Sequence, residues 1–137
     1  MRLYTTSGRL VYKNVTQYLI DWDKKSRSKI QFKVKQFLKN FWENHIVYEE
    51  FPVYGSRLKV DILNATKKIA VEINGKQHTS FNEFFHKDRV NYLSSLKRDH
   101  KKGEWLRAND FELLEIEENE IKNLSLDFIQ KKFGINI

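Results

Sequence analysis

Cysteine is absent from the 137 residues of this chain, which excludes disulfides, thiolate zinc sites and cysteine nucleophiles and fits a reducing, cytoplasmic compartment. Only one proline and five glycines occur, and no repeat or low-complexity tract interrupts the chain, so we expect a single domain. No apolar run reaches the roughly 18 residues that a membrane-spanning helix needs. Residues 1–8 contain no apolar core of a signal peptide, so we expect no secretory signal.

Basic side chains are abundant instead. Lysine and arginine number 25 against 18 acidic residues, which gives a net charge of +7 and a pI near 9.5. Such an excess favours a polyanionic partner, and nucleic acid is the commonest one. A soluble lysine-rich protein would show the same excess, so charge alone does not separate the two. The 40% apolar and 14% aromatic content indicates a globular chain with a real core.

Two helices are predicted first along the chain. Apolar residues recur at helical spacing between residues 12 and 24, which predicts a short helix there. Ser28 is a suitable N-cap for a second helix, which we expect to stop near Asn44 or His45. Its apolar residues follow the spacing of three and four positions: Ile30, Val34, Phe37, Leu38, Phe41 and Trp42.

The rest of the chain alternates between strand-like and helical patterns. β-branched and aromatic runs predict strands, and a 3,4-spaced apolar set predicts a helix between the third and fourth strands. The predicted strands are 46–53, 57–63, 68–74 and 111–116, with helices at 81–102 and around residues 121–129. The order α-α-β-β-β-α-β-α predicts an α/β fold, a central mixed four-stranded sheet flanked by helices.

Two acidic residues lie on neighbouring predicted strands. Asp61 comes late in the second strand, and Glu72 lies inside Ile-Ala-Val-Glu-Ile, the most buried-looking strand. Strand carboxylates usually face solvent, but a buried one is costly unless a metal or a partner satisfies it. Two adjacent carboxylates favour a hard divalent cation such as Mg²⁺, which takes oxygen ligands and a phosphate oxygen and lowers the pKa of a bound water. The pattern therefore predicts phosphoryl-transfer chemistry at a metal ion.

The strings Val-Asp-Ile at residues 60–62 and Ile-Ala-Val-Glu-Ile-Asn-Gly-Lys-Gln-His at 69–78 resemble the core of PD-(D/E)XK nucleases. They are most similar to the small branch with Glu-x-Asp-Gly-x-Gln-His, which includes very-short-patch-repair endonucleases and related phage and intron-borne homing endonucleases. A helix with Arg98-Asp99-x-x-Lys102 and a strand ending in Leu-x-Ile at residues 114–116 extend the resemblance over about residues 28–122.

The resemblance implies a restriction-endonuclease-like core and a metal-dependent DNA endonuclease, encoded by a phage or mobile element, that hydrolyses phosphodiester bonds with Mg²⁺ or Mn²⁺. Residues 1–137 would form one nuclease domain. It divides into an N-terminal helical extension (1–27), the core (28–122) and a C-terminal helix (123–137).

The site residues follow from that resemblance. Asp61, Glu72 and the main-chain carbonyl of Ile73 would bind the metal. Two positions depart from the family pattern: Asn74 replaces Lys or Asp, and Gln31 replaces a metal-orienting Glu, so less negative charge surrounds the metal. Lys76 or Lys102 would then supply positive charge at the phosphate.

Other polar residues complete the expected site. Gln31, Asn74, Gln77 and His78 would surround the reaction centre, with His78 a general base or water-orienting group. His78 is otherwise a loop histidine, and Lys102 otherwise one partner of a surface ion pair. DNA-backbone contacts are expected from Lys76, Arg98, Lys101 and Arg107. A second basic patch, otherwise a solvated helix face, comprises Lys24, Lys25, Arg27, Lys29, Lys33 and Lys35.

Several uses of such a site remain open at this stage. A homing or nicking endonuclease, a branched-DNA (Holliday-junction) resolvase and a repair endonuclease share the same chemistry, and an RNA-directed nuclease is a further alternative. From another class, a DNA-binding module whose nuclease site has decayed would also show Gln31 and Asn74. One active site cuts one strand, so a double-strand break would need a homodimer or a partner subunit.

Overall fold

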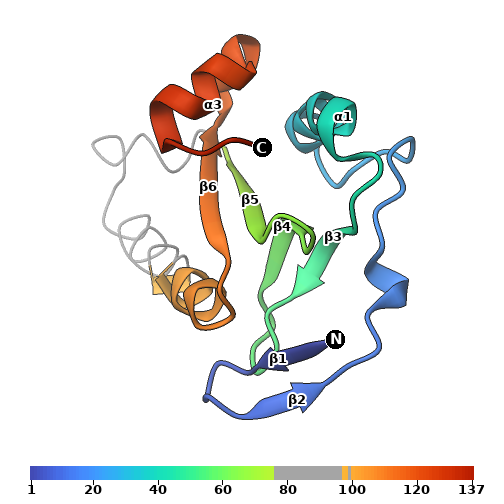
Figure 1. Ribbon diagram of the computed structural model, residues 1–137, viewed down its shortest axis with the longest axis vertical. Coiled ribbons are helices and arrows are strands. Elements are labelled where there is room, and N and C mark those ends of the chain that lie inside the picture. Colours follow the sequence, from blue (N-terminus) through green and yellow to red (C-terminus); the bar gives the residue numbers. More distant parts are fainter. Residues whose placement is uncertain (76–96, 99) are drawn as a thin grey trace, which may run out of the picture.

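A four-stranded mixed sheet forms the centre of the protein (Figure 1). The computed structural model describes residues 1–75, 97, 98 and 100–137. The strands lie in the order β3-β4-β5-β6; β3, β4 and β5 run antiparallel and β6 lies parallel to β5. Their bounds are Val47–Pro52, Lys59–Asn64, Ile69–Asn74 and Glu112–Glu117. The predicted mixed sheet with flanking helices is thus confirmed, with each strand displaced by at most two residues at either end.

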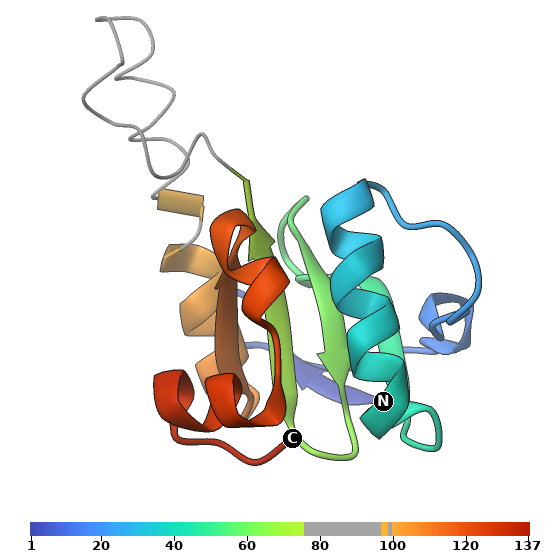
Figure 2. The ribbon, with the colours of Figure 1, turned by 90° about the horizontal axis from the view of Figure 1, so that it is seen from above.

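Helices cover both faces of this sheet, so the fold has three layers (Figure 2). Residues 100–108 belong to a helix between β5 and β6, the crossover helix, which was expected to end at residue 102. Its Trp105 and Leu106 pack in the crossover-side core with Phe51, Val60, Leu63 and Ala70. Helices α1 (Lys29–Trp42) and α3 (Leu126–Phe133) cover the other face. The core between these two helices and the sheet is called the α1-side core. In it, helix residues pack against sheet residues: Val34, Leu38, Trp42 and Ile129 against Ile62, Ile69, Val71, Leu114 and Ile116.

Helix α1 begins at the predicted cap. The Ser28 hydroxyl accepts a hydrogen bond from the backbone N–H of Gln31 at 3.2 Å, which satisfies one of the free N–H groups of the first turn. The helix ends at Trp42, two or three residues before the expected stop. Lys35, placed in a solvated basic patch by its charge, is instead completely buried beneath α1, because Glu49 of β3 supplies a carboxylate 2.8 Å from its ammonium group.

The predicted helix over residues 12–24 is wrong. The N-terminus forms an antiparallel hairpin of β1 (Arg2–Tyr4) and β2 (Leu10–Tyr12), followed by the 3-10 turn η1 (Thr16–Tyr18). The side chain of Asn14 accepts hydrogen bonds from the backbone N–H and the hydroxyl of Thr16. Such local side-chain bonding competes with helix formation.

The apolar residues of this segment serve two cores rather than one. Val15 and Tyr18 pack in the crossover-side core, whereas Ile20 and Trp22 pack against the α1-side core. The chain passes the β3 edge of the sheet in between, where the N–H of Ile20 donates to the carbonyl of Val47 at 3.0 Å. A helix presents one apolar face, so it could not supply both cores.

Polar contacts dock the N-terminal hairpin. The carbonyl of Tyr4 accepts from the indole N–H of Trp105 at 2.7 Å, and the N–H of Tyr4 donates to the Asn109 side chain at 2.8 Å. Gly55, in the β3–β4 turn, has a φ of +96°, and a Cβ there would collide with Thr6. Only glycine adopts this conformation without strain beside so close a neighbour.

The C-terminal segment is divided where one helix was expected. The 3-10 helix η4 (Glu118–Asn123) comes directly after β6, and α3 begins after a second cap, the Ser125 hydroxyl, which accepts from the N–H of Phe128 at 3.0 Å. In the described part of the chain, no helix has the length and apolarity needed to cross a bilayer.

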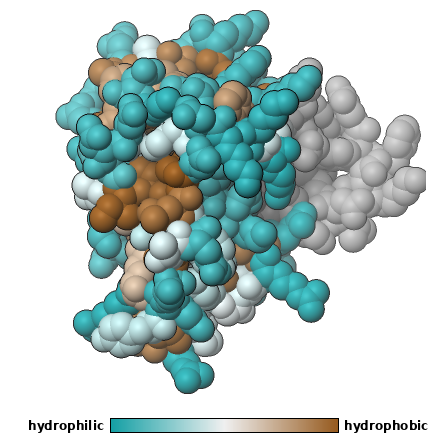
Figure 3. Space-filling model, turned by 90° about the vertical axis from the view of Figure 1, so that its right-hand side faces the viewer, coloured by the Kyte–Doolittle hydropathy of each residue, from teal (hydrophilic) through white to brown (hydrophobic). Residues whose placement is uncertain are grey.

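The surface is largely hydrophilic, but an apolar patch is visible on the face shown in Figure 3. Large apolar side chains that remain exposed include Leu19 and Ile46, which are 49% and 54% exposed. Both adjoin the β3 edge of the sheet: Leu19 bridges to Tyr48, and Ile46 directly precedes β3.

Candidate functional site

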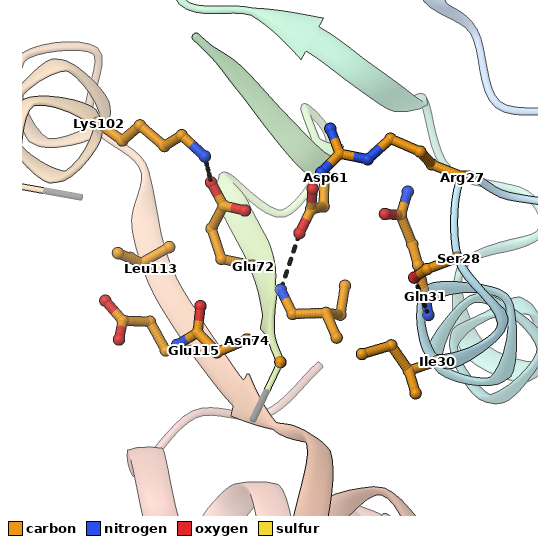
Figure 4. A pocket seen from close by; sticks show the side chains of 12 residues that line it. Arg27, Ser28, Ile30, Gln31, Asp61, Glu72, Asn74, Lys102, Leu113 and Glu115 are labelled. Atoms are coloured by element: carbon orange, nitrogen blue, oxygen red, sulfur yellow. Dashed lines mark hydrogen bonds and ion pairs between the residues drawn. The ribbon is translucent and has the colours of Figure 1, made fainter. Parts of the chain in front are cut away.

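Strands β4 and β5 bring Asp61 and Glu72 together. Their register pairs Ile62 with Val71, so Asp61 and Glu72 are the next residues along the two strands and lie opposite each other. Figure 4 shows both carboxyl groups on the same side of the sheet, directed into one pocket. The arrangement required by the sequence interpretation, two carboxylates meeting across adjacent strands, is therefore present.

Asp61 is held by the main chain of the neighbouring strand. Its Oδ2 accepts a hydrogen bond from the N–H of Ile73 at 2.9 Å. The regular β4–β5 pairing covers only three residue pairs and ends at Ile62 and Val71. The Asp61 side chain therefore satisfies an N–H that the ladder no longer pairs, and this bond fixes the position of the carboxylate.

Glu72 is buried, with 8% of its surface exposed. The Lys102 ammonium lies 3.0 Å from its Oε1 and forms an ion pair with it. Burial, and then the negative charge of Asp61, raise the pKa of Glu72 to about 9, although Lys102 opposes the shift. Burial therefore favours the protonated form of Glu72 unless further positive charge binds beside it.

The pocket around these groups has a volume of about 320 Å³. Lys102 reaches Glu72 from the crossover helix, and α1 forms the opposite wall (Figure 4). The lining residues are Arg27, Ser28, Ile30, Gln31, Asp61, Glu72, Ile73, Asn74, Gly75, Lys102, Leu113 and Glu115. Segments far apart in the sequence thus meet at one polar cavity.

The donor set suits a hard divalent cation. Two carboxylates that repel each other in one pocket, one of them buried, are groups that Mg²⁺ or Mn²⁺ would satisfy. Asp61 and Glu72 would hold the ion, together with the main-chain carbonyl of Ile73. No cluster of three or more His, Cys, Asp or Glu ligands occurs among the described residues, so carbonyl oxygens and water would complete the coordination, as Mg²⁺ prefers.

Gln31 faces the pocket, as its helical position predicted, and is 3% exposed. Its amide nitrogen donates to Glu49 at 2.9 Å and to Glu50 at 3.1 Å. Both N–H donors are therefore used by carboxylates of β3. The amide oxygen remains, and it can accept a hydrogen bond from a water in the pocket.

Asn74 lines the same pocket, but its side chain is engaged. Its amide nitrogen donates to Oε1 of Glu117, its register partner on β6, at 3.1 Å. The other oxygen, Oε2, of Glu117 is buried without a partner among the described residues. Asn74 is thus oriented by a carboxylate, with its amide oxygen left to accept a bond.

The remaining predicted residues separate into two groups. Lys76, Gln77 and His78 lie outside the described residues, as does Asp99. The side chains of Arg98, Lys101 and Arg107 are exposed and do not line the pocket, although they belong to the same helix as Lys102. They remain predicted contacts of a nucleic-acid backbone.

Three acidic and basic residues of the site were missed from the sequence as members of it. Glu115 lines the pocket as the register partner of Glu72. Glu50 lies opposite Asp61, because the neighbouring residues pair Glu49 with Ile62 and Phe51 with Val60. The φ of Glu50, +53°, interrupts the β3–β4 pairing at this position. The sheet thus carries one carboxylate per strand along a single row. Arg27, which was assigned from the sequence only to a basic patch, also lines the pocket. Its position directly before the Ser28 cap was the sequence signal that could have placed it near the start of α1 and so near Gln31.

Comparison with known proteins adds one relative. The chain is 37% identical over 65 residues to the uncharacterized protein 033L of invertebrate iridescent virus 3. The match covers 47% of this chain and about a third (34%) of the viral protein's length. No protein-family model matches the chain, and no solved structure does.

Proposed function

We propose that the protein is a metal-dependent endonuclease with a restriction-endonuclease-like core of the PD-(D/E)XK type, acting on DNA phosphodiester bonds. One observation carries this proposal: Asp61 and Glu72 converge in a polar pocket that a cationic side chain, Lys102, also enters. The hairpin, crossover helix and parallel fourth strand support it.

A Mg²⁺ or Mn²⁺ ion held by Asp61 and Glu72 would supply an activated water and positive charge for the transition state. Lys102 neutralises charge at Glu72 and is placed to bind a non-bridging phosphate oxygen beside it. The Gln31 amide oxygen orients a water by accepting a hydrogen bond from it, because both N–H donors of Gln31 are already bound. Leu113 and Ile30 form apolar parts of the wall and limit access of bulk water.

The hydrogen bond from Asn74 to Glu117 favours a second candidate, a nucleic-acid-binding module with a decayed site. An asparagine cannot act as the base or the cation that the family places there. This candidate shares the DNA contacts but predicts no cleavage at any metal concentration. Metal-dependent turnover therefore separates the two.

The test is cleavage of supercoiled plasmid, single-stranded DNA, four-way-junction DNA and RNA, with Mg²⁺, Mn²⁺ or EDTA. Asp61→Asn keeps an oxygen for the Ile73 N–H but removes the charge, and should reduce cleavage about a thousandfold, since metal-assisted stabilisation amounts to several kcal/mol. Glu115→Gln is the matched control, because it removes a carboxylate from the same pocket on the neighbouring strand.

The outcomes are distinct. Cleavage by the wild type and by Glu115→Gln, with loss in Asp61→Asn, supports the proposal. Equal cleavage by Asp61→Asn and the wild type, or cleavage that persists in EDTA, rejects it. The substrate that is cut fastest assigns the protein among homing, junction-resolving, repair and RNA-directed nucleases, and nicked against linear plasmid shows whether two copies act together.

A further inference from the structure

A second cation faces the carboxylate pair from the wall opposite Lys102. Arg27 lines the pocket and extends toward Asp61 from the α1 side, whereas Lys102 reaches Glu72 from the crossover helix (Figure 4). The ion pairs formed among the described residues include Lys102 but not Arg27. Positive groups thus stand on both sides of the pair, and one of them has its charge uncommitted within the described structure.

The loop that carries Arg27 is anchored at four points. Three α1 side chains hold residues 22–24. These bonds run from Lys35 to the Lys24 carbonyl at 2.8 Å, from Gln36 to the Trp22 carbonyl at 2.6 Å, and from Lys39 to Asp23 at 2.9 Å. Ser26, directly before Arg27, donates to Glu49 at 2.6 Å.

Two of these anchors converge on one partly buried group. The Glu49 carboxylate receives Ser26 and Gln31 on one oxygen and the fully buried Lys35 on the other. Burying a lysine is costly unless it is paired and hydrogen-bonded. The network links the Arg27 loop, the pocket residue Gln31 and strand β3, so Arg27 begins from a fixed backbone.

The start of α1 adds to the positive potential at this wall. Its first turn contains no acidic residue, and Lys29 directly follows the cap. A helix N-terminus carries a partial positive charge that attracts anions.

We propose that Arg27 binds the phosphate next to the scissile one, so that a nucleic-acid strand crosses the pocket from the crossover helix to the N-terminus of α1. This inference rests on the proposed function for the identity of the scissile phosphate. Ser26 and Glu49 act as positioning residues, because they hold the Arg27 backbone without touching the strand. Arg27 and Lys102 bind phosphates on either side of the carboxylate pair. Without these two cations, the carboxylates would repel the phosphates.

The experiment measures nucleic-acid binding in EDTA at several salt concentrations, so that no metal-dependent cutting interferes. Arg27→Ala should weaken binding about tenfold and reduce the salt slope by about one, the effect of losing one phosphate contact. Arg27→Lys should keep the slope and bind about threefold more weakly, because lysine keeps the charge but not the forked geometry. Lys67→Ala is the control, since Lys67 is an exposed cation in the turn at the opposite end of β4 and β5.

Two further readouts separate positioning from general stability. As a single substitution, Ser26→Ala should weaken nucleic-acid binding several-fold. In a protein that already carries Arg27→Ala, it should weaken binding little further, since both residues act through one phosphate contact. In single-turnover cleavage, Arg27→Ala should raise the half-saturating protein concentration more than it lowers the saturating rate. Because the Arg27 side chain is exposed, the thermal unfolding midpoint of the Arg27→Ala protein should match that of the wild type.

An unchanged salt slope in Arg27→Ala, or an equal loss in Lys67→Ala, overturns the inference while leaving the nuclease proposal intact. Arg27-dependent binding without metal-dependent cutting supports the path of the strand across the pocket, but rejects the nuclease and with it the scissile phosphate. A wild-type protein that binds neither DNA nor RNA at low salt rejects both.

Discussion

Glu72→Gln should make the metal-free protein more stable. Glu72 is buried beside Asp61, and its pKa is raised from 4.5 to about 9, so the folded protein holds a proton that the unfolded chain releases. Its contribution to stability is therefore fully present below about pH 4.5 and is lost as the pH rises to about 9. A glutamine amide imitates the protonated acid at every pH: its oxygen can face Lys102 and its nitrogen can face Asp61.

The pKa difference sets the size of the effect. Each pH unit above 4.5 is worth about 1.4 kcal/mol of unfolding free energy until the folded-state value is reached. The variant should therefore exceed the wild type by about 1 kcal/mol at pH 5.5 and by several kcal/mol at pH 7.5. For a chain of this length, the larger difference corresponds to a thermal midpoint about 10 °C higher.

The assay is urea denaturation in EDTA at three pH values between about 5.5 and 8.5. Glu115→Gln is the control, because its carboxyl group lines the same pocket but is exposed. Mn²⁺ should then stabilise the wild type and leave Glu72→Gln unchanged, since only an intact pair binds the ion. The prediction would be refuted if the unfolding free energies of Glu72→Gln and the wild type changed in parallel with pH. It would also be refuted if the variant were less stable than the wild type at every pH.

Three more predictions follow from the same contacts. Mn²⁺ affinity, measured by calorimetry, should rise up to about tenfold per pH unit between pH 7 and 9, because binding displaces the Glu72 proton; a flat profile would contradict this. Lys35→Met should cost about 3 kcal/mol by leaving the partly buried Glu49 carboxylate without its cation, whereas Lys39→Met, which breaks an exposed pair with Asp23, should leave the denaturant midpoint nearly unchanged; equal losses in denaturant midpoint would refute the distinction. Gly55→Ala should lower the unfolding free energy by about 1–3 kcal/mol, because its φ is +96° and Thr6 blocks a Cβ, with metal binding retained in the folded protein.

The parts of the fold predicted correctly depend on local signals. Ser28 caps α1 as expected, and alternation within β4 and β5 places Asp61 and Glu72 on one side because a short turn joins the two strands. A hairpin makes such a meeting nearly independent of the rest of the protein. The approach of Lys102 was open to prediction only through the family resemblance, since it comes from a helix far along the chain.

The errors arise where a side chain depends on distant partners. Lysine spacing could not show that Lys35 is buried, because Glu49, which makes burial possible, comes from another element. The N-terminal spacing was read as one helix face, but Val15 and Trp22 enter different cores on either side of the sheet. The positive φ of Glu50 and the place of Arg27 at the pocket likewise depend on tertiary packing that no local pattern records.

Asp61 and Glu72 belong to a single hairpin, separated by only ten residues. Hairpins of this kind close in about 1–10 μs, long before a crossover helix or a distant loop can dock. The repulsion between the two acids therefore opposes an early step of folding rather than the final closing of the pocket. Protons or a divalent ion, by removing that repulsion, should speed folding as well as slow unfolding.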